Sequence, residues 1–316
     1  MADLVFTLYD LDGRVLQVNN LISYELCQDA DAPCDSLSLR FLCKCALPEI
    51  LSVEAKADGK RVFFGYVDTQ REEKNINGFV CFIYARSSAC LLTDSEAKPN
   101  TYYSASTGGL WKANCENLGF EYALGDIYCD YPYQVSKGTS VFGALQKFVY
   151  GVTGKSIRVT PDNVVEIMKT KNRRSNMKNI LSIKRIINRA NALAEIRYKL
   201  NSEQDYIYRR ESEFIKGRRI TASVMKNLSS VEDWQRDRLL SSMMADANSE
   251  YYTYEISMLG YNQVELMDEV EIQDEHFGEV YGVAFSIVHS LDENGEKTFV
   301  KIKKQLDLEE RTYVDE

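Results

Sequence analysis

Residues Tyr251 to Leu306 decide the fold, and two segments show their pattern most clearly: Glu269-Val270-Glu271-Ile272-Gln273 and Phe299-Val300-Lys301-Ile302-Lys303. Apolar and polar residues alternate in both, which is the period of a half-buried β-strand. Turns at Asp274–Gly278 and Asp292–Gly295 separate the later strands. We predict an antiparallel β-meander with these strands: Tyr251–Met258, Glu269–Gln273, Gly278–His289 and Thr298–Gln305.

A second stretch near the N-terminus repeats this organisation, with a turn at Ala57-Asp58-Gly59 between two of its strands. When Gly65 is placed on Gly282, the apolar residues on either side of the two glycines also coincide. Identity is low, so a chance likeness between two meanders is the alternative. We interpret the pair as a diverged internal duplication, built from these N-terminal segments: 37–45, 51–56, 61–69 and 78–85.

The composition is that of a globular protein. Hydrophobic residues make up 45% and charged residues 27% of the 316 residues, which is enough to bury a sizeable core. A chain of this length has room for about two or three domains. Its 20 Tyr and 13 Phe favour sheet over helix. The net charge of −9 argues against nucleic-acid binding as the main task.

One segment departs from this acidic average. Between Lys169 and Arg219, fifteen Lys and Arg residues stand against five Asp and Glu, a charge of +10 that leaves −19 for the remainder. Such a block is either a solvated face or a surface that sets register with another copy of the chain or with an acidic partner. In the second case, charge reversal should weaken assembly. The candidate interface residues are Arg173, Arg174, Arg218 and Arg219.

The eight cysteines lack a zinc-binding spacing, since no C-x-x-C pair occurs and Cys43-Lys44-Cys45 places two thiols on one strand face. Met1-Ala2-Asp3 leads directly into a predicted strand, so we expect no signal peptide. These features predict synthesis in the cytosol with reduced, mostly buried thiols. No apolar run approaches the length that a membrane helix needs.

The fold class predicted from these patterns is mainly β, with two similar small antiparallel β-barrels, an α+β module and an inserted helix. Helical spacing and stop signals predict helices at Gly108–Leu118, Ser140–Tyr150 and Val231–Ala247. A strand hairpin is expected after the second helix, over 156–168. The predicted domains are 1–95, first barrel; 96–178, α+β module; 179–225 with 250–308, a split second barrel; 226–249, helical insert; 309–316, acidic tail.

Residues suited to catalysis are sparse. The two histidines, His276 in a predicted turn and His289 at a strand end, are poor candidates for a general base. The segment Gly151–Ser156 contains part of a phosphate-loop pattern, but a helix precedes it and a strand follows it, which reverses the P-loop order. Gly154 is therefore expected in a tight turn. Acidic pairs in hairpin tips are typical of turns and do not indicate a metal site. From these observations together we expect no enzyme activity, no cofactor and no metal.

Three groups of segments carry a resemblance to a known family through their order along nearly the whole chain. They are Leu37–Phe41, Val62–Asp68 and Tyr84–Leu92; then Phe142–Ile167; then Val280–His289 and Gly295–Ile302. In this order they resemble the baseplate hub proteins of contractile phage tails, R-type bacteriocins and related contractile injection systems. None of them is a catalytic signature. The chain shows no added lysozyme or peptidase segment, so we expect cell-wall cleavage to come from another protein.

The resemblance implies a structural role. Hubs of this kind are trimers in which each chain carries two tail-tube-like barrels, so three chains offer six similar units to a hexameric tube. It implies a homotrimer that binds the tail tube protein, the central spike protein, other baseplate proteins and the tape measure. It also implies a place in a virion tail baseplate or phage tail-like particle, assembled in the bacterial host cytoplasm. No membrane and no specific nucleic-acid binding are expected.

A β-rich protein that binds cell-wall glycans or mediates adhesion is the alternative hypothesis. Its mark would be an exposed aromatic platform, for which the tyrosine-rich stretches Tyr128–Tyr133 and Tyr251–Tyr254 are candidates. Ordinary packing of tyrosines in strands is the competing explanation for both stretches. A hydrolase is a third hypothesis, which the sparse acid–base residues disfavour.

Overall fold

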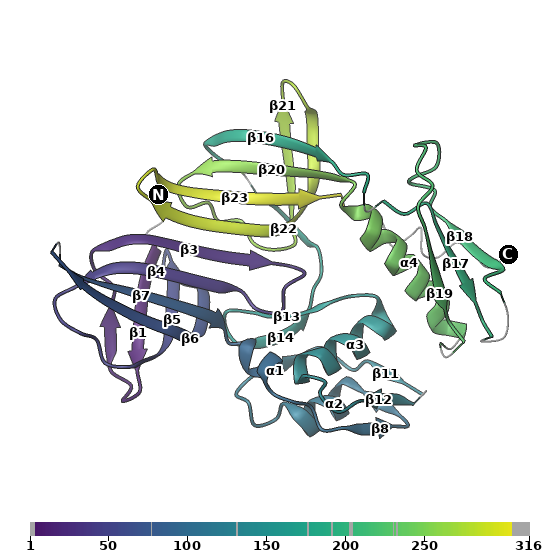
Figure 1. The fold of residues 1–316 in the computed structure, drawn as a ribbon, viewed down its shortest axis with the longest axis horizontal. Coiled ribbons are helices and arrows are strands. Elements are labelled where there is room, and N and C mark those ends of the chain that lie inside the picture. Colours follow the sequence, from purple (N-terminus) through teal and green to yellow (C-terminus); the bar gives the residue numbers. More distant parts are fainter. Residues whose placement is uncertain are drawn as a thin grey trace.

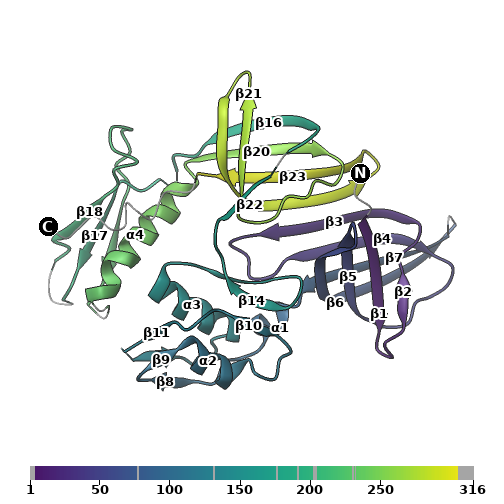
Figure 2. The same cartoon turned by 180° about the vertical axis from the view of Figure 1, so that it is seen from behind.

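The computed structural model describes residues 4–76, 78–130, 132–175, 177–190, 192–201, 205–229, 231 and 233–304. Four parts are visible in Figure 1: a front module at the N-terminus, a middle module, a rear module, and an insert within the rear module. Figure 2 shows them from behind, with the front module and the insert at opposite ends of the rear module. The predicted acidic tail lies outside the described residues.

The front module is an antiparallel sheet with the strand order β3-β4-β7-β6-β5-β1-β2. Alternating residues point into one core, where Leu39, Phe63 and Ile83 are fully buried, as the two-residue period of the sequence predicts. The strands are β1 (Leu4–Asp10), β2 (Val15–Gln17), β3 (Leu21–Asp29), β4 (Ser36–Cys43), β5 (Ile50–Ala57), β6 (Lys60–Asn75) and β7 (Gly78–Ser87).

The middle module packs helices against short strands. α3 begins after Ser140, whose hydroxyl accepts a hydrogen bond from the backbone N–H of Gly143 at 3.0 Å, and it ends at Gly154 in the left-handed conformation. The predicted turn at Gly154 is confirmed. The elements are α1 (Cys90–Asp94), β8 (Asn100–Tyr102), β9 (Ala105–Ser106), α2 (Thr107–Asn114), β10 (Glu121–Ala123), β11 (Tyr128–Cys129), β12 (Tyr133–Val135), α3 (Val141–Thr153), β13 (Ile157–Val159) and β14 (Val164–Ile167).

The rear module has the strand order β16-β20-β23-β22, and β21 pairs with β22. A sixth strand, β15, pairs with β21 in the parallel sense. Ile256, Ile287 and Ile302 lie in its core, fully buried. The strands are β15 (Lys171–Ser175), β16 (Ile180–Ile187), β20 (Tyr252–Leu259), β21 (Asp268–Asp274), β22 (Gly278–Asp292) and β23 (Gly295–Lys303).

The insert lies between β16 and β20 and forms a sheet of its own. Ile196 and Leu240 pack between that sheet and the helix that covers it. The sequence patterns assigned the strands of 179–225 to the rear barrel, and the structure differs: β16 joins the rear sheet, whereas the later strands satisfy their backbone groups with one another. The elements are β17 (Glu195–Lys199), β18 (Tyr208–Glu211), β19 (Ser223–Asn227) and α4 (Asp233–Ser249).

The front and rear modules share one register over four strands, β4 to β7 and β20 to β23. The partners Val53 with Gly65 and Val67 with Ala85 correspond to Val270 with Gly282 and Ala284 with Ile302, at a constant offset of 217 residues (Gly282 minus Gly65). One irregularity in the ladder recurs: β6 and β7 shift register between Val67 and Thr69, and β22 and β23 between Ala284 and Ser286. A second shift, between Ala55 and Lys56 of β5, has no counterpart in β21.

The outer strands β3 and β16 extend this correspondence. β3 shifts register against β4 between Leu21 and Ser23, and β16 shifts against β20 between Ile180 and Ser182, an offset of 159 residues (Ile180 minus Leu21). The smaller offset arises because the insert lengthens the connection between β16 and β20. Five strands therefore correspond in order, direction and register, which supports the interpretation of the repeat as an internal duplication.

Gly65 and Gly282 are equivalent because the backbone approaches both closely. A Cβ on Gly65 would lie 2.1 Å from the carbonyl oxygen of Arg86, and one on Gly282 would lie 2.8 Å from the carbonyl oxygen of Lys303. Arg86 and Lys303 are themselves related by the same offset. Glycine is thus required at this crossing in each module, since any side chain would overlap with backbone.

The predicted class, mainly β with antiparallel sheets, is confirmed, but the expected closed barrels are not present in the described strand pairing. That pairing runs as one open path from β16 at one end to β2 at the other. Alternation in a sequence identifies the two faces of a strand but not the neighbour that would close a ring. Within the described residues, no helix is long and apolar enough to cross a lipid bilayer.

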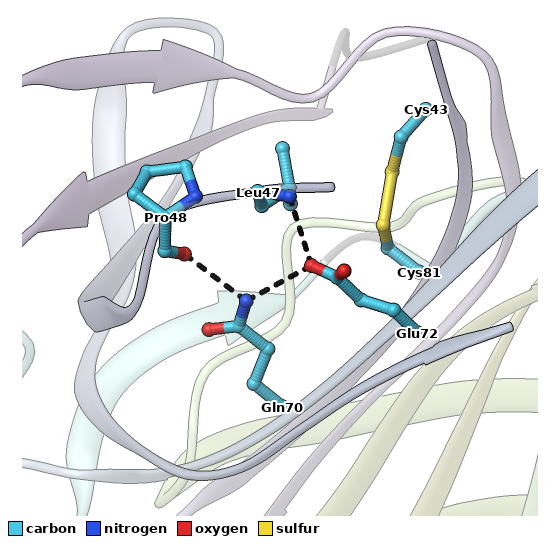
Figure 3. Close-up of a disulfide and its surroundings, with 6 residues drawn as sticks. All are labelled: Cys43, Leu47, Pro48, Gln70, Glu72 and Cys81. Carbon is cyan, nitrogen blue, oxygen red and sulfur yellow. Dashed lines mark hydrogen bonds between the residues drawn. A yellow bond between two sulfur atoms is a disulfide. The ribbon is translucent and has the colours of Figure 1, made fainter. Parts of the chain in front are cut away.

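The front module contains a disulfide between Cys43 on β4 and Cys81 on β7 (Figure 3). The expectation of reduced thiols was therefore wrong for Cys43 and Cys81, which the antiparallel pairing of β4 with β7 brings together. Beside it, the loop 44–49 is anchored to β6. The side-chain amide of Gln70 donates to the carbonyl of Pro48 at 3.0 Å, and the Glu72 carboxylate accepts from the backbone N–H of Leu47 at 2.9 Å.

Candidate functional site

The two β modules are joined edge to edge by a pair of strands. β22 pairs antiparallel with β3 from Ser286 opposite Asp29 to Leu291 opposite Tyr24, as both views show (Figure 1, Figure 2). The backbone N–H of Ala30 continues the ladder by donating to the carbonyl of Phe285 at 2.8 Å. The pairing covers one edge of each module, which would otherwise present unpaired backbone groups.

Buried and half-buried side chains reinforce the junction from its inner face. The Tyr24 hydroxyl donates to one carboxylate oxygen of Glu296 at 2.8 Å, and the other oxygen accepts from the backbone N–H of Tyr261 at 3.0 Å. Burial raises the pKa of Tyr24, and the bond to Glu296 raises it further. The Tyr261 ring stacks on His289 with centroids 4.3 Å apart. The Tyr24–Glu296 bond fixes β3 against the rear module, and the contacts of Tyr261 hold Glu296 and His289 in place there.

Glu265 ties the front module to two segments of the rear module. It lies in the rear-module loop before β21 and accepts from Lys60 of β6 at 2.5 Å and from Lys171 of β15 at 2.6 Å. Burial alone would raise the pKa of Glu265, but the bonds from Lys171 and Lys60 outweigh it and lower the pKa to about 2. Next to it, the side chain of Gln263 donates to Asp58 at 2.9 Å.

An open cleft of about 410 Å³ lies where all four parts meet. On its walls Lys303 pairs with Asp31 at 3.5 Å and lies 4.7 Å from the centre of the Phe285 ring. The Tyr150 hydroxyl of the middle module donates to Asp246 of α4. Residues from all four parts line this cleft, so it is a seam between domains.

The predicted basic residues lie on separate elements. Arg218 is used within the chain: its guanidinium donates to Tyr252 at 3.0 Å and lies about 5 Å from the rings of Phe214 and Tyr251. Arg219 next to it is exposed, with a left-handed backbone, and lines an open pocket of about 550 Å³ in the insert. Its role at an interface stays a prediction.

The other predicted pair, Arg173 and Arg174, belongs to β15, where Arg174 lies opposite Glu269 of β21. The side chains of both arginines lie outside the described part of the structure. Arg173 and Arg174 therefore belong to the rear sheet, and Arg218 and Arg219 belong to the insert. The sequence patterns did not identify the residues at the module junction. No local signal marks these, because Tyr24 and Glu265 each bind a residue of the other module that is more than 200 positions away.

Of the two histidines, His276 lies in the predicted turn, whereas His289 lies inside β22, which continues to Asp292 beyond the predicted strand end. His276 is exposed in the turn after β21, and its backbone N–H donates to Asp274 at 2.9 Å. His289 is buried, its ring within 3.1 Å of the Thr298 hydroxyl, and burial lowers its pKa to about 3. Among the described residues, no cluster of three or more metal-ligating side chains occurs. The expected lack of catalytic activity remains a prediction.

The tyrosine stretches differ in exposure. Tyr251 is 2% exposed and packs edge-on against Phe214 and Tyr252, so the Tyr251–Tyr254 stretch is not an open platform. Tyr128 in the middle module is 66% exposed. A row of stacked aromatic faces is what a glycan platform requires, and the rear-module stretch does not provide it.

The fold is similar to that of phage tail proteins and components of related secretion machines. A tail protein from Neisseria meningitidis MC58 matches with a TM-score of 0.75 and 15% identity over 96% of both chains. The 43 kDa tail protein of prophage MuSo2 from Shewanella oneidensis matches with a TM-score of 0.79 and 12% identity, over 96% of this chain and 99% of that one.

A component of the E. coli type VI secretion system, described as structurally similar to the T4 bacteriophage tail proteins gp27 and gp5, matches with a TM-score of 0.54. Its identity is 11%, over 92% of this chain and 74% of that one. No protein-family model matches the chain, and no curated protein matches it by sequence. At these identities the likeness establishes a shared tail-protein fold.

Proposed function

We propose that this chain is a structural hub of a contractile tail or a related injection particle. Three copies would form a ring in which front and rear modules alternate, presenting six similar units to a hexameric tail tube and a threefold face to a central spike. The observation that carries the proposal is the repeated register: one chain contains two sheets that correspond strand by strand and are joined edge to edge.

Symmetry gives this repeat a physical purpose. A sixfold tube that meets a threefold spike must change symmetry at one layer, and identical single-module subunits would leave contacts unmatched there. Two diverged tail-tube-like modules per chain keep six similar sites on one side and allow three different sites on the other. The similarity to tail proteins of Neisseria and Shewanella supports the same role.

The partners on this proposal are the tail tube protein, the central spike protein, other baseplate proteins and the tape measure. The chain would reside in a virion tail baseplate or a tail-like particle and act as a structural protein without catalytic activity. The similarity to a secretion component described as like gp27 and gp5 supports a position next to a spike.

Mass photometry of the purified full chain, alone and with its spike partner, tests the proposal. A trimer is expected, or a monomer that becomes a trimer when the spike is added. A stable monomer that joins neither tube nor spike at any concentration would contradict the hub assignment.

The basic block gives a narrower test. Arg219→Glu should weaken assembly if this surface sets the register between subunits, because Arg219 is exposed. Arg218→Glu would be a poor test, since it would also remove the contacts to Tyr252 and Phe214. Unchanged trimer formation by Arg219→Glu would leave that residue on a solvated face.

A further inference from the structure

The internal junction predicts a second junction of the same form. In the first, Ser286–Leu291 of β22 pairs with Tyr24–Asp29 of β3. The repeated register gives each segment a counterpart in the other module. The counterpart of Ser286–Leu291 is Thr69–Lys74 of β6, and the counterpart of Tyr24–Asp29 is Ile183–Asn188 at β16.

Both counterparts lie on sheet edges that are free in the described part of the chain. β5 covers this edge of β6 only as far as Tyr66, so Thr69–Lys74 pairs with β7 alone and its side chains are largely exposed. β16 pairs with β20 and ends the path of strands, and its residues Leu181 and Ile187 are exposed. An exposed edge of this length is a template for another strand.

The loop next to β6 does not obstruct such pairing. In the front module, loop 44–49 is attached to Gln70 and Glu72 from the inner face. The rear module has the equivalent loop, in which Tyr261 stacks on His289, the counterpart of Glu72. That loop leaves the β22 edge open to β3, and the same arrangement leaves the β6 edge accessible.

The side chains on the two free edges are complementary in the register that the internal junction sets. The pair His289 opposite Leu26 corresponds to Glu72 opposite Arg185 on the free edges. The pair Ser290 opposite Glu25 corresponds to Glu73 opposite Lys184. Two carboxylates thus face two cations directly across the strands, where oppositely charged pairs stabilise a sheet. Lys184 and Arg185 also belong to the basic block of 169–219.

The existing contacts of these four residues leave room for this pairing. Lys184 is exposed and forms one ion pair, with Glu255 at 3.1 Å. Arg185 is exposed, with its guanidinium 5.4 Å from the centre of the Phe277 ring. Glu72 has a carboxylate that accepts from Leu47 and Gln70, and such a group can accept further bonds. Glu73 is exposed.

We propose that Thr69–Lys74 of one copy pairs antiparallel with Ile183–Asn188 of the next copy, with Glu72 opposite Arg185 and Glu73 opposite Lys184. The partner is therefore a second copy of this chain. The inference rests on the hub proposal and gives it an interface. Each contact is head-to-tail, and alternation of internal and intermolecular junctions closes three chains into a ring of six modules.

The difference between the two junctions follows from their tethering. The internal strands are held by one chain, and no oppositely charged pair faces across them: His289 lies opposite Leu26 and Ser290 opposite Glu25. Free edges must select the correct edge of another molecule and the correct register. Charges on a free edge ordinarily discourage pairing, but opposite signs in matching positions select one partner and repel each edge from itself.

Charge reversal and exchange test the proposed pairing. Glu72→Lys with Glu73→Lys, and separately Lys184→Glu with Arg185→Glu, should each weaken trimer formation at least about tenfold, because like charges then face each other across the strands. The four substitutions together should restore it to within about threefold. Asp12→Lys with Arg14→Glu, in the exposed turn between β1 and β2, is the matched control and should leave trimer formation unchanged.

Mass photometry over a concentration series measures trimer formation, and circular dichroism confirms that each variant is folded. A trimer that both reversed pairs leave intact would overturn the strand pairing while the hub proposal stands. A wild-type chain that stays monomeric with tube and spike present would overturn both.

Hydrogen exchange of the wild-type trimer gives a readout of the backbone itself. Amides within Thr69–Lys74 and Ile183–Asn188 should exchange at least about tenfold more slowly in the trimer than in the diluted monomer, because pairing withdraws edge amides from water. Equal exchange in trimer and monomer would overturn the pairing.

Discussion

The front and rear modules use one strand framework held by different side chains. Where the front module has the Cys43–Cys81 disulfide, the rear module has Gly260 and Thr298, and the Thr298 hydroxyl donates to the carbonyl of Gly260 at 2.8 Å. Where the front module passes from β3 to β4 through residues 30–35, the rear module carries the whole insert. The register of the strands is nevertheless the same.

This contrast teaches that pairing register is more constrained than side-chain chemistry. A slip of one residue would turn every core residue to the opposite face, so register cannot drift gradually. The sixth strand of each module does not share this correspondence: β1 lies antiparallel to β5, whereas β15 lies parallel to β21. The repeat is complete over five strands, and the element beyond them differs in direction.

Removal of the disulfide should give the largest difference in stability loss between the two modules. Cys43→Ala with Cys81→Ala should lower the free energy of unfolding by about 3 to 4 kcal/mol, because the cross-link restricts the unfolded chain across a separation of 38 residues. Thr298→Ala at the equivalent rear position should cost about 2 kcal/mol, because the buried hydroxyl also accepts from the backbone N–H of Asn262 and contacts His289. Urea unfolding measures both. The exposed, free Cys45 is the control as Cys45→Ser, and equal losses in the two modules would contradict the prediction.

Substitution of Gly65 and Gly282, the glycines at the close strand crossings, should instead destabilise both modules in the same way. Gly65→Ala should destabilise the protein by about 3 kcal/mol and Gly282→Ala by about 2 kcal/mol, since the added Cβ would overlap with backbone in both cases and more closely at Gly65. Gly151→Ala in α3, where space is open, should be neutral or stabilising by up to about 1 kcal/mol. Thermal unfolding provides the comparison, and a neutral Gly65→Ala would refute the close approach of β6 and β7.

Acid should loosen the contact between the modules through Glu265. Its pKa is lowered from 4.5 to about 2 in the folded chain, so the unfolded state binds more protons between these values and stability falls as pH falls through them. Wild type should exceed Glu265→Gln by about 1 to 2 kcal/mol at pH 7 after allowance for solvent screening. Stability curves against pH should converge near pH 2. Glu279→Gln, at an exposed position, is the control, and a constant difference across this range would contradict the ionic contact.

The smallest effect is expected for the hydrogen bond across the junction. Tyr24→Phe should lower stability by about 1 kcal/mol, because it removes the donor to Glu296 and keeps the packed ring. Tyr103→Phe, at an exposed position, should change nothing. Denaturant unfolding of the two variants measures the difference, and no loss in Tyr24→Phe would mean that the hydrogen bond contributes nothing to the junction.

Much of the framework was accessible from local patterns. The alternation in β21 and β23 identified their two faces, the turns at 57–59 and 274–278 separated the right strands, and Gly65 was correctly placed on Gly282. The strands of the insert were located but assigned to the wrong sheet, because a strand pattern does not name its neighbour. The disulfide was missed for the same reason, since Cys43 and Cys81 meet only after β4 and β7 pair.

The candidate interface could likewise be predicted only in part from the sequence. The basic block of 169–219 was recognisable from charge alone, but its members have different surroundings. Arg218 is enclosed by aromatic rings within its own chain, whereas Lys184 and Arg185 lie along a free edge. Nothing in the order of residues distinguishes these positions. The distinction comes from the register against β20 and from the comparison with β3 and β22.

By itself, the order of residues determined where strands run, where they turn and that the β framework occurs twice, because alternation, turn residues and glycine spacing act over a few neighbouring positions. Only the tertiary structure decided that β3 joins β22, that Glu265 meets Lys60 and Lys171, and which edges stay free. These features depend on groups that lie far apart along the chain, and their contact exists only once the sheets have paired.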